Sequence, residues 1–285
     1  GIIGTGRVGC AIGYGLSRSR RIKCQIIAND RVKRQVRRFY QLLNLKYQAR
    51  SACEIAQLAD IIFITTNDSE IKNVYQTIYP HLKSNQVVVH CSGVYSNAIL
   101  EKPQSAKDKR ILKIGLWPIQ TFPTQKFELA MLRNCYYVVE AQGKAKEIGK
   151  EIVNALHGQA IFVAEKDKAL YHIIGVFVSN YLVALLSVVN DIGQYLKIKP
   201  AKLLRLFMPI INQTLKNIYK TGVKKSLSGP IIRGDIETIK LHLKMLSKKM
   251  PKLLPIYRVL GLKTLELIKN QPAVIKTIKS LFESK

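Results

Sequence analysis

Acidic residues are scarce in this chain, which has 18 Asp and Glu against 46 Lys and Arg in 285 residues and a formal net charge of +28. A charge of this size raises nucleic acid or an anionic membrane surface as partners. However, the sequence has no zinc-finger spacing, no aromatic RNP motif and no basic tail, and its lysines are spread along the chain. We therefore expect a protein with a very basic surface and no specific nucleic-acid partner.

Cysteine is also sparse and follows no binding pattern. The five cysteines are odd in number, lie in the first half of the chain and include no C-x-x-C pair. This usage argues against a disulfide framework and is typical of reduced, buried thiols. We therefore expect a cytoplasmic protein.

Long apolar runs are nearly missing. The run Leu170–Val189 approaches the length of a membrane span. It contains His172, Ser179 and Asn180, which are unfavourable in the middle of a span. We therefore interpret it as a buried helix and expect no membrane span.

The chain begins with a strand that leads into a glycine-rich turn, GIIGTGRVGCAIG. Gly4, Gly6 and Gly9 have the G-x-G-x-x-G spacing of a dinucleotide-binding turn, in which each glycine has its own task. The first allows the tight turn, the second lets the backbone approach a pyrophosphate, and the third lets the next helix pack closely. With 17 glycines in the chain the spacing alone is weak evidence, so the context must decide.

The context fits this interpretation. A helix is expected over Arg7–Leu16, and the buried strand Cys24–Ala28 follows it. The ribose-reading group is expected about twenty residues after the glycines, where Asn29, Asp30 and Arg31 occur. Arginine suits a 2′-phosphate, so we predict NADP, although Asp30 leaves NAD open. Alternatively, the basic residues from Arg31 onward form a solvated helix face.

Strand and helix signals alternate through the first half of the chain. Buried runs at Ile61–Thr65 and Val87–Gly93 flank a helix expected over Ser69–Leu82, and Ser51 and Glu54 form a capping box before another helix. Alternation of this kind predicts an α/β fold with a doubly wound, Rossmann-type parallel sheet. Ligands bind at the carboxyl ends of such strands. We therefore expect the cofactor to contact Gly4, Thr5, Gly6, Arg7, Val8, Gly9, Asn29, Arg31, Thr65, Thr66, Asn67, His90 and Ser92.

Further strands are expected at Ile114–Pro123, Tyr136–Glu140 and Ala160–Val163, after which the strand signals stop. From Glu165 onward we expect helices only. The sequence thus predicts an NADP-binding domain over residues 1–164 and an all-α domain over residues 165–285.

The helical half contains two groups of polar residues suited to catalysis. Helical spacing places His172, Ser179 and Asn180 on one side of an apolar helix, where either helix packing or a substrate must satisfy them. Hydride transfer needs a proton donor or acceptor, a role that suits His172. In the loop Leu227–Asp235, Arg233 is suited to clamp a carboxylate or phosphate, and a purely structural turn is the equal alternative.

Five segments, GTGRVG, HCSG, LWPIQTF, YHIIGVFVSNYLVALL and LSGPIIRGD, occur in this order and spacing. With them the chain resembles Rossmann-like proteins that carry a C-terminal domain of unknown function 2520. These proteins are similar to deazaflavin-dependent NADP reductases, pyrroline-5-carboxylate reductase and ketopantoate reductase. The resemblance implies an NADP-binding domain, a helical domain that forms a homodimer, and a substrate cleft between them.

Matched position by position, the resemblance also implies site residues. They are Gly4, Gly6 and Gly9 in the turn, His90 and Ser92 after a central strand, Tyr171, His172, Ser179 and Asn180 on the long helix, and Gly229, Pro230, Arg233, Gly234 and Asp235 in the late loop. One position departs from the pattern, because Trp117 stands where we expect a histidine before a proline. If that histidine transfers protons, this chain is altered in activity or specificity.

Two functions follow as hypotheses. The first is an NAD(P)-dependent oxidoreductase that transfers a hydride to or from a small keto, imine or hydroxy substrate, with His172 as proton donor and Asn180, Ser179 and Arg233 at the substrate. The second is a dinucleotide-binding regulatory or scaffold protein without turnover.

Overall fold

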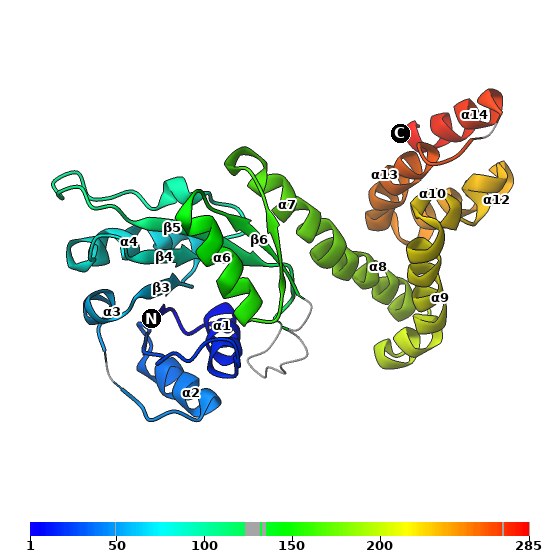
Figure 1. Cartoon of the computed structure of the whole chain (residues 1–285). Helices are drawn as coiled ribbons and strands as arrows, with labels where there is room; N and C mark the ends of the chain where they lie inside the picture. The colour runs from blue at the N-terminus through cyan, green and yellow to red at the C-terminus, as the bar shows by residue number, and fades with distance from the viewer. Residues whose placement is uncertain (49, 123–131, 133–134, 270, 285) are drawn as a thin grey trace. The chain divides into compact units, whose positions relative to one another are not determined.

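The computed structural model describes residues 1–48, 50–122, 132, 135–269 and 271–284 (Figure 1). Contacts within the chain divide it into two compact units, Gly1–Leu182 and Val183–Lys285. The first unit contains the sheet and the glycine motif. Pro123, at the end of one predicted strand, lies outside the described residues.

The described residues of the first unit form a seven-stranded sheet with the order β2-β1-β3-β4-β5-β6-β7. Neighbouring strands are parallel except β5 and β6, which pair antiparallel, so β6 and β7 run opposite to the other strands. The strand order reverses between β1 and β3, as in doubly wound folds. The strands are β1 (Ile2–Ile3), β2 (Ala28–Asn29), β3 (Ile61–Ile64), β4 (Val87–His90), β5 (Leu112–Pro118), β6 (Tyr136–Glu140) and β7 (Gln159–Phe162).

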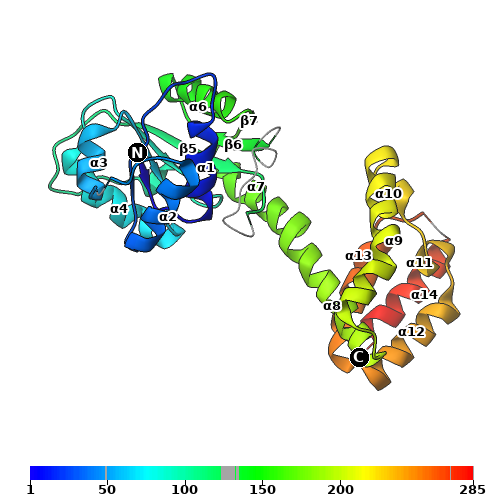
Figure 2. The same cartoon turned by 90° about the horizontal axis from the view of Figure 1, so that it is seen from below.

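Alternate side chains of the strands enter two separate cores, one on each face of the sheet. Figures 1 and 2 show the helices that lie against the sheet. On one face, residues such as Ile2 and Val89 pack with α1, α2 and α6. On the other face, residues such as Ile3 and Val88 pack with α3 and α4. This alternation follows from the two-residue period of a strand. The helices are α1 (Arg7–Ser17), α2 (Lys33–Leu43), α3 (Ala52–Leu58), α4 (Ile71–Ile78) and α6 (Lys144–Ala155).

Beyond β7 the described part of the chain contains helices and connecting turns and no strand. It begins with α7 (Lys168–Gly175), a π-helical turn (Val176–Asn180) and α8 (Tyr181–Tyr195). The second unit has a small core made by Ile239, Leu265, Ile278 and Phe282. The predicted α/β fold with a helical C-terminal part is confirmed. The remaining helices are α9 (Pro200–Thr221), α10 (Val223–Ser226), α11 (Pro230–Arg233), α12 (Ile236–Lys249), α13 (Leu254–Leu265) and α14 (Pro272–Glu283).

Short 3-10 turns connect several of these elements. The predicted capping box is confirmed, because Ser51 Oγ accepts from Glu54 N at 3.1 Å and the Glu54 carboxylate accepts from Ser51 N at 2.8 Å. The helix predicted over Ser69–Leu82 is instead α4 with a 3-10 turn on each side. The side chain of Asp68 caps neither α4 nor the 3-10 turn before it. The 3-10 turns in the described chain are Asp68–Glu70, Tyr79–His81, Asn97–Ile99, Glu165–Asp167 and Pro251–Leu253.

The prediction of a buried helix over Leu170–Val189 is wrong for the single chain. Among the described residues, the helical stretch Glu165–Tyr195 is long and apolar enough to cross a membrane, and none of its most apolar window is buried. Phe177, for example, is 62% exposed and Val183 is 67% exposed. Large exposed apolar surfaces of this kind are typical of interaction sites. Length and composition alone are weak evidence of a membrane span.

The predicted thiol environment is only partly correct. All five cysteines lie in the described part of the chain and are free. Cys10 and Cys135 are buried, as expected, whereas Cys24 is exposed. The buried strand predicted to start at Cys24 begins only at Ala28, because just Ala28 and Asn29 pair with β1.

Candidate nucleotide and active site

The glycine turn after β1 depends on close contacts that a side chain would prevent. Gly4 has φ +99°, and a Cβ on it would lie 2.7 Å from the carbonyl carbon of Thr65. A Cβ on Gly9 would lie 2.1 Å from Gly4 O, because α1 packs directly against the turn. Thr65 also stabilises the turn, because its hydroxyl donates a hydrogen bond to Gly4 O at 2.5 Å. Packing within the protein therefore requires glycine at positions 4 and 9.

Gly6 differs from Gly4 and Gly9, because packing within the described protein does not exclude a side chain there. A Cβ on Gly6 would meet no atom of the described chain within 4 Å. Gly6 is also the N-cap of α1, and none of the described side chains caps this helix. The first N–H groups of α1 therefore face open space, where the helix dipole favours an anion. This combination fits the pyrophosphate of a dinucleotide.

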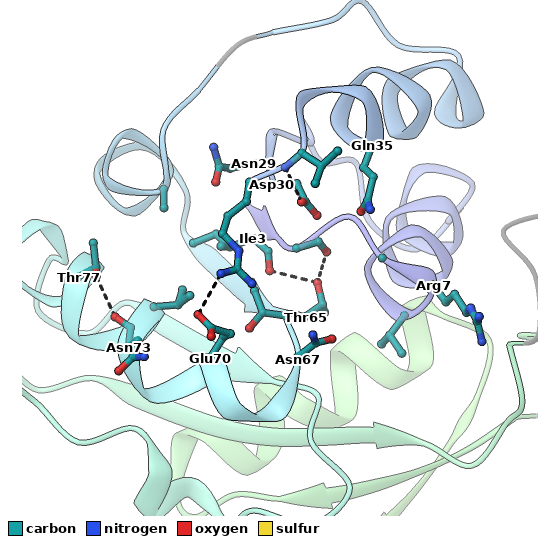
Figure 3. Close-up of a pocket in the computed structure, with 18 residues that line it drawn as sticks. Ile3, Arg7, Asn29, Asp30, Gln35, Thr65, Asn67, Glu70, Asn73 and Thr77 are labelled. Carbon is teal, nitrogen blue, oxygen red and sulfur yellow. Dashed lines mark hydrogen bonds and ion pairs between the residues drawn. The ribbon is translucent and has the colours of Figure 1, made fainter. Parts of the chain in front are cut away.

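A pocket of about 800 Å³ opens at this turn (Figure 3). Its size is within the range of small-molecule sites, and it lies where the strand order reverses between β1 and β3. Its walls come from the carboxyl ends of β1, β2 and β3 and from the start of α1. The predicted cofactor residues in these walls are Gly4, Gly6, Arg7, Val8, Asn29, Arg31, Thr65, Thr66 and Asn67.

The other predicted cofactor residues, Thr5, Gly9, His90 and Ser92, are not among the pocket-lining residues. Thr5 is buried, and its N–H donates to Asp30 Oδ2 at 2.7 Å. Gly9 lies behind the turn against Gly4. Ser92 Oγ accepts two backbone N–H groups of the turn that follows it, and His90 is fully buried. In the described structure these residues support the turn and the strand ends.

One polar wall of the pocket was not predicted. Glu70, Asn73 and Thr77 line it from the segment that follows β3, and Gln35 lines it from α2 (Figure 3). Glu70, Asn73 and Thr77 recur at helical spacing directly after the β3 strand end, and this spacing was the available signal.

Asp30 and Arg31, at the end of β2, have different partners. Asp30 Oδ2 accepts the N–H and hydroxyl of Thr5 at 2.7 and 3.2 Å, and its Oδ1 accepts from Val32 N at 3.0 Å. The Asp30 carboxylate therefore holds the glycine turn. Arg31 is 78% exposed, and its guanidinium lies 3.5 Å from the Glu70 carboxylate, the ion pair drawn at Glu70 in Figure 3. Exposed pairs of this kind are weak, so an anionic ligand can compete with Glu70 for Arg31.

His172 lies beside the loop that follows β4. A Cβ on Gly93 would lie 2.4 Å from His172 Cδ2, and the His172 ring is 5.4 Å from the Trp117 ring between centroids. A Cβ on Gly175 would lie 2.9 Å from Trp117 Cη2, and one on Gly93 would lie 3.1 Å from its Nε1. Gly93 and Gly175 therefore make room for the indole. Because β4 pairs with β3, His172 lies one strand beyond the strand ends that line the pocket.

Ser179 and Asn180 both lie in the π-helical turn Val176–Asn180. A π turn bonds residues i and i+5, so its residues deviate from α-helical spacing. His172, Gly175 and Ser179 are half-buried at the predicted spacing, whereas Asn180 is exposed. The predicted stripe therefore extends to Ser179 and is wrong for Asn180. Turns of this kind are frequent at functional sites.

Arg233 belongs to the second unit, at the end of α11. The two glycines that flank α11, Gly229 and Gly234, have φ +103° and +68°. Asp235 caps the next helix, since its Oδ1 accepts from Thr238 N at 3.1 Å. The Arg233 guanidinium is 63% exposed and lies 3.9 Å from the Asp235 carboxylate. These contacts account for the loop as an inter-helix turn that presents an exposed arginine.

A buried ionic cluster that sequence spacing does not reveal lies at the carboxyl ends of β4 and β6. Lys168 Nζ is 3.1 Å from Glu140 Oε2 and 3.5 Å from His90 Nε2. The Lys168 and Glu140 side chains are 1% and 9% exposed. Burial lowers the pKa of His90 to about 3, and the charge of Lys168 acts in the same direction. His90 is therefore neutral at physiological pH.

Two family models match the chain in succession. The family described as NADP oxidoreductase, coenzyme F420-dependent, matches residues 1–93, and the domain of unknown function 2520 matches residues 135–264. The chain combines these two modules. The predicted resemblance is confirmed, and so is NADP as the cofactor of the matching family. No curated protein matches the chain.

Several solved structures share the fold. A candidate NADP oxidoreductase of Bacteroides fragilis is 19% identical, with a TM-score of 0.75 over 93% of this chain and 96% of its own. A protein of Thermotoga maritima is 22% identical, with a TM-score of 0.62 over 99% and 98%. The pyrroline carboxylate reductase of Plasmodium falciparum with NADP bound is 16% identical, with a TM-score of 0.58 over 99% and 97%. At these identities the likeness establishes the fold alone.

The glycines of the turn predict a matched pair of variants. Gly6→Ala places its methyl group in open space, so we expect a loss of about 1 kcal/mol or less in unfolding free energy but at least roughly tenfold weaker NADPH binding. Gly9→Ala forces α1 off the turn, so we expect a loss of about 1–3 kcal/mol. Urea denaturation and NADPH titration measure both. NADPH affinity unchanged by Gly6→Ala would contradict the assignment of the open space to the pyrophosphate.

The buried neutral His90 predicts a pH dependence of stability. An unfolded histidine takes up a proton near pH 6.5, whereas folded His90 does so only near pH 3. As the pH falls from 6.5 toward 3, the unfolding free energy should therefore fall by up to about 1.4 kcal/mol per pH unit from this group. Urea denaturation of wild type and His90→Gln between pH 7.5 and 4.5 should show a smaller slope for the variant below pH 6.5 and equal slopes above it. Equal slopes throughout would refute this.

Proposed function

We propose that this protein is an NADP(H)-dependent oxidoreductase that transfers a hydride to or from a small keto, imine or hydroxy substrate. The observation that carries the proposal is the open space in front of Gly6 at the uncapped start of α1, inside a pocket at the reversal of strand order. An oxidoreductase also needs a proton-transferring group near the reacting carbon. His172, beside the loop after the next strand, is the group that we assign to this role.

The assignment of NADP rather than NAD depends on Arg31 and Asp30. A carboxylate that reads the ribose hydroxyls of NAD would repel a 2′-phosphate. Here both oxygens of Asp30 already accept hydrogen bonds from the glycine turn and from Val32. Arg31 is the exposed cation at the same strand end, and guanidinium groups bind phosphate well. We infer that the 2′-phosphate takes the place of Glu70 at Arg31.

In the proposed reaction, NADPH bound across the strand ends supplies the hydride. Hydride addition to a carbonyl or imine leaves a negative charge on oxygen or nitrogen, and His172 would donate the proton that neutralises it. Trp117 would hold the imidazole against Gly93 and exclude water from one side of it. Asn180, exposed at the end of the π turn, is the side chain that we assign to orienting the substrate, with Ser179 beside it.

A second candidate function is dinucleotide binding without turnover, as in a regulatory or scaffold protein. Trp117 favours it, because the indole occupies the space between Gly93 and Gly175 next to His172. A substrate would have to enter beside this ring. The two candidates share the nucleotide pocket and differ only in catalysis.

Nucleotide titration tests the shared part. We expect NADPH to bind more tightly than NADH, and Arg31→Ala to weaken NADPH by roughly 10- to 100-fold, the range of a charge-assisted hydrogen bond, with little effect on NADH. Glu70→Gln removes the competing carboxylate and should strengthen NADPH binding. Fluorescence or calorimetry measures these affinities. Equal losses of the two nucleotides in Arg31→Ala would refute the role of Arg31, and absence of binding to either would refute both candidates.

The same preparation then separates the two candidates. Panels of keto acids, imines and aldehydes are tested for oxidation of NADPH. Oxidation that His172→Ala abolishes without changing the NADPH affinity supports the oxidoreductase. Binding without turnover on all panels supports the regulatory candidate. Nucleic-acid binding that is strongly salt-dependent and that neither nucleotide displaces would instead make the charge of +28 functional.

We further propose that the exposed apolar face of α7 and α8 docks onto a second copy of this chain. Asp191 is the only charged residue from Ala169 to Leu196, in a chain with a net charge of +28. A two-fold contact through this stretch therefore avoids the lysines that would repel each other elsewhere. An anionic membrane surface would attract those lysines instead of this stretch, whose only charge is the negative one of Asp191.

The dimer predicts a concentration-dependent mass. We expect a dimer by light scattering, dissociated by Val183→Asp, since Val183 is 67% exposed on α8. Leu58→Asp, at a 57% exposed leucine of α3, is the matched control and should leave the dimer intact. A monomer at all concentrations would refute the dimer, and binding to neutral vesicles that Val183→Asp abolishes would assign the face to a membrane.

A further inference from the structure

One buried carboxylate joins the segments that bring His172 to the sheet. Glu140, the last residue of β6, accepts from Asn97 N with Oε1 at 2.8 Å and from Lys168 Nζ with Oε2 at 3.1 Å. Asn97 Nδ2 also donates to the Glu140 carbonyl at 2.9 Å. Glu140 therefore connects the loop after β4 to the first residue of α7.

A second contact joins the same two segments. Ser96 Oγ donates to Glu165 Oε1 at 2.7 Å, just before α7 begins. Glu165 is exposed, so this bond is weaker than the buried one. Together the two contacts fix the start of α7 against the loop that contains Gly93.

The surroundings of Lys168 are shaped for its ammonium group. A Cβ on Gly115 of β5 would lie 2.3 Å from Lys168 Nζ, so a side chain there would displace the ammonium group from its position beside Glu140. His90 is neutral and adds no second positive charge. Burial lowers the pKa of Lys168, and the adjacent Glu140 opposes this shift. A buried ion pair often contributes little net stability, so a positioning role explains the pair better than stabilisation does.

The spacing along α7 gives that explanation. His172 follows Lys168 by four residues, about one helical turn. Anchoring Lys168 therefore fixes the rotation of α7 about its axis and the position of His172 along that axis. At that position His172 contacts Gly93 and Trp117. Further along the helix, large apolar side chains such as Phe177, Val178 and Val183 are exposed.

We propose that Glu140 and Lys168 are positioning residues, which hold His172 against Gly93 and Trp117. As regards catalysis, this inference rests on the proposed function, in which His172 transfers the proton. The placement of His172 itself is measurable without a substrate, because Trp117 is the single tryptophan of the chain. A protonated imidazole in contact with an indole quenches its fluorescence, so Trp117 emission reports the contact.

The test compares Trp117 emission between pH 8 and 5, the range in which imidazoles titrate. We expect wild type to lose emission as the pH falls, and His172→Gln to abolish this quenching. Lys168→Met and Gly115→Ala should also abolish it. Lys113→Met is the matched control, since Lys113 is a half-buried lysine of the same sheet that bonds Leu100 O instead of Glu140. It should keep the quenching of wild type.

Removal of one charge from a buried pair can unfold the protein. The double variant Glu140→Gln/Lys168→Met removes both charges, so circular dichroism and the melting temperature should show a folded protein. We expect this variant to lose the acid quenching and, if a substrate is found, to lower kcat by roughly tenfold or more, about 1.4 kcal/mol, with NADPH affinity unchanged.

Full acid quenching in the folded double variant would overturn the positioning role. The outcome is distinct from a failure of the proposed function, in which NADPH does not bind or no substrate reacts while Trp117 still senses His172. An equal loss of NADPH affinity and of quenching would also overturn it, because it would indicate general damage to the sheet.

Discussion

The contact between α1 and the glycine turn is the constraint on which the nucleotide site depends. Because the Gly4 carbonyl occupies the space that a side chain at position 9 would need, the helix lies directly on the end of β1. This packing directs the first N–H groups of α1 toward the edge where β1, β2 and β3 end. Thr65 and Asp30 then hold the turn from the neighbouring strands. The open space at Gly6 is thus produced by tight packing on both of its sides.

The same contact explains the electrostatic character of the pocket. Asp30 lies at the position where a ribose-binding acid is expected, but its hydrogen bonds are directed toward the turn. The positive charge of Arg31 is therefore not cancelled by its neighbour in sequence and meets Glu70 across the pocket instead. An exposed arginine paired with an exchangeable carboxylate is well suited to a ligand that carries an additional phosphate.

Local rules were sufficient to predict the parts of the fold and of the pocket that depend on near neighbours in sequence. Glycine spacing, strand ends and the capping box at Ser51 each rest on a few consecutive residues. The Lys168–Glu140 pair was not predictable in this way, because a lysine at a helix start and a glutamate at a strand end carry no mutual signal. The π turn was missed for a related reason. Its apolar residues suit an α-helix equally well, and only the resulting rotation distinguishes the two.

Burial of the long helix was the clearest error of the sequence-based prediction, and it is informative about how this protein works. Within the described residues, the long apolar helix forms one ion pair, between Lys168 at its start and Glu140. This pair orients the start of the helix and carries His172 to the sheet, whereas apolar side chains further along, such as Val183, are exposed. The apolar pattern therefore covers both the anchored start and the exposed part of the helix. Sequence periodicity cannot separate these two parts, because both contain the same residue types. The distinction comes from the one buried charge at the helix start, where the chain is joined to Glu140.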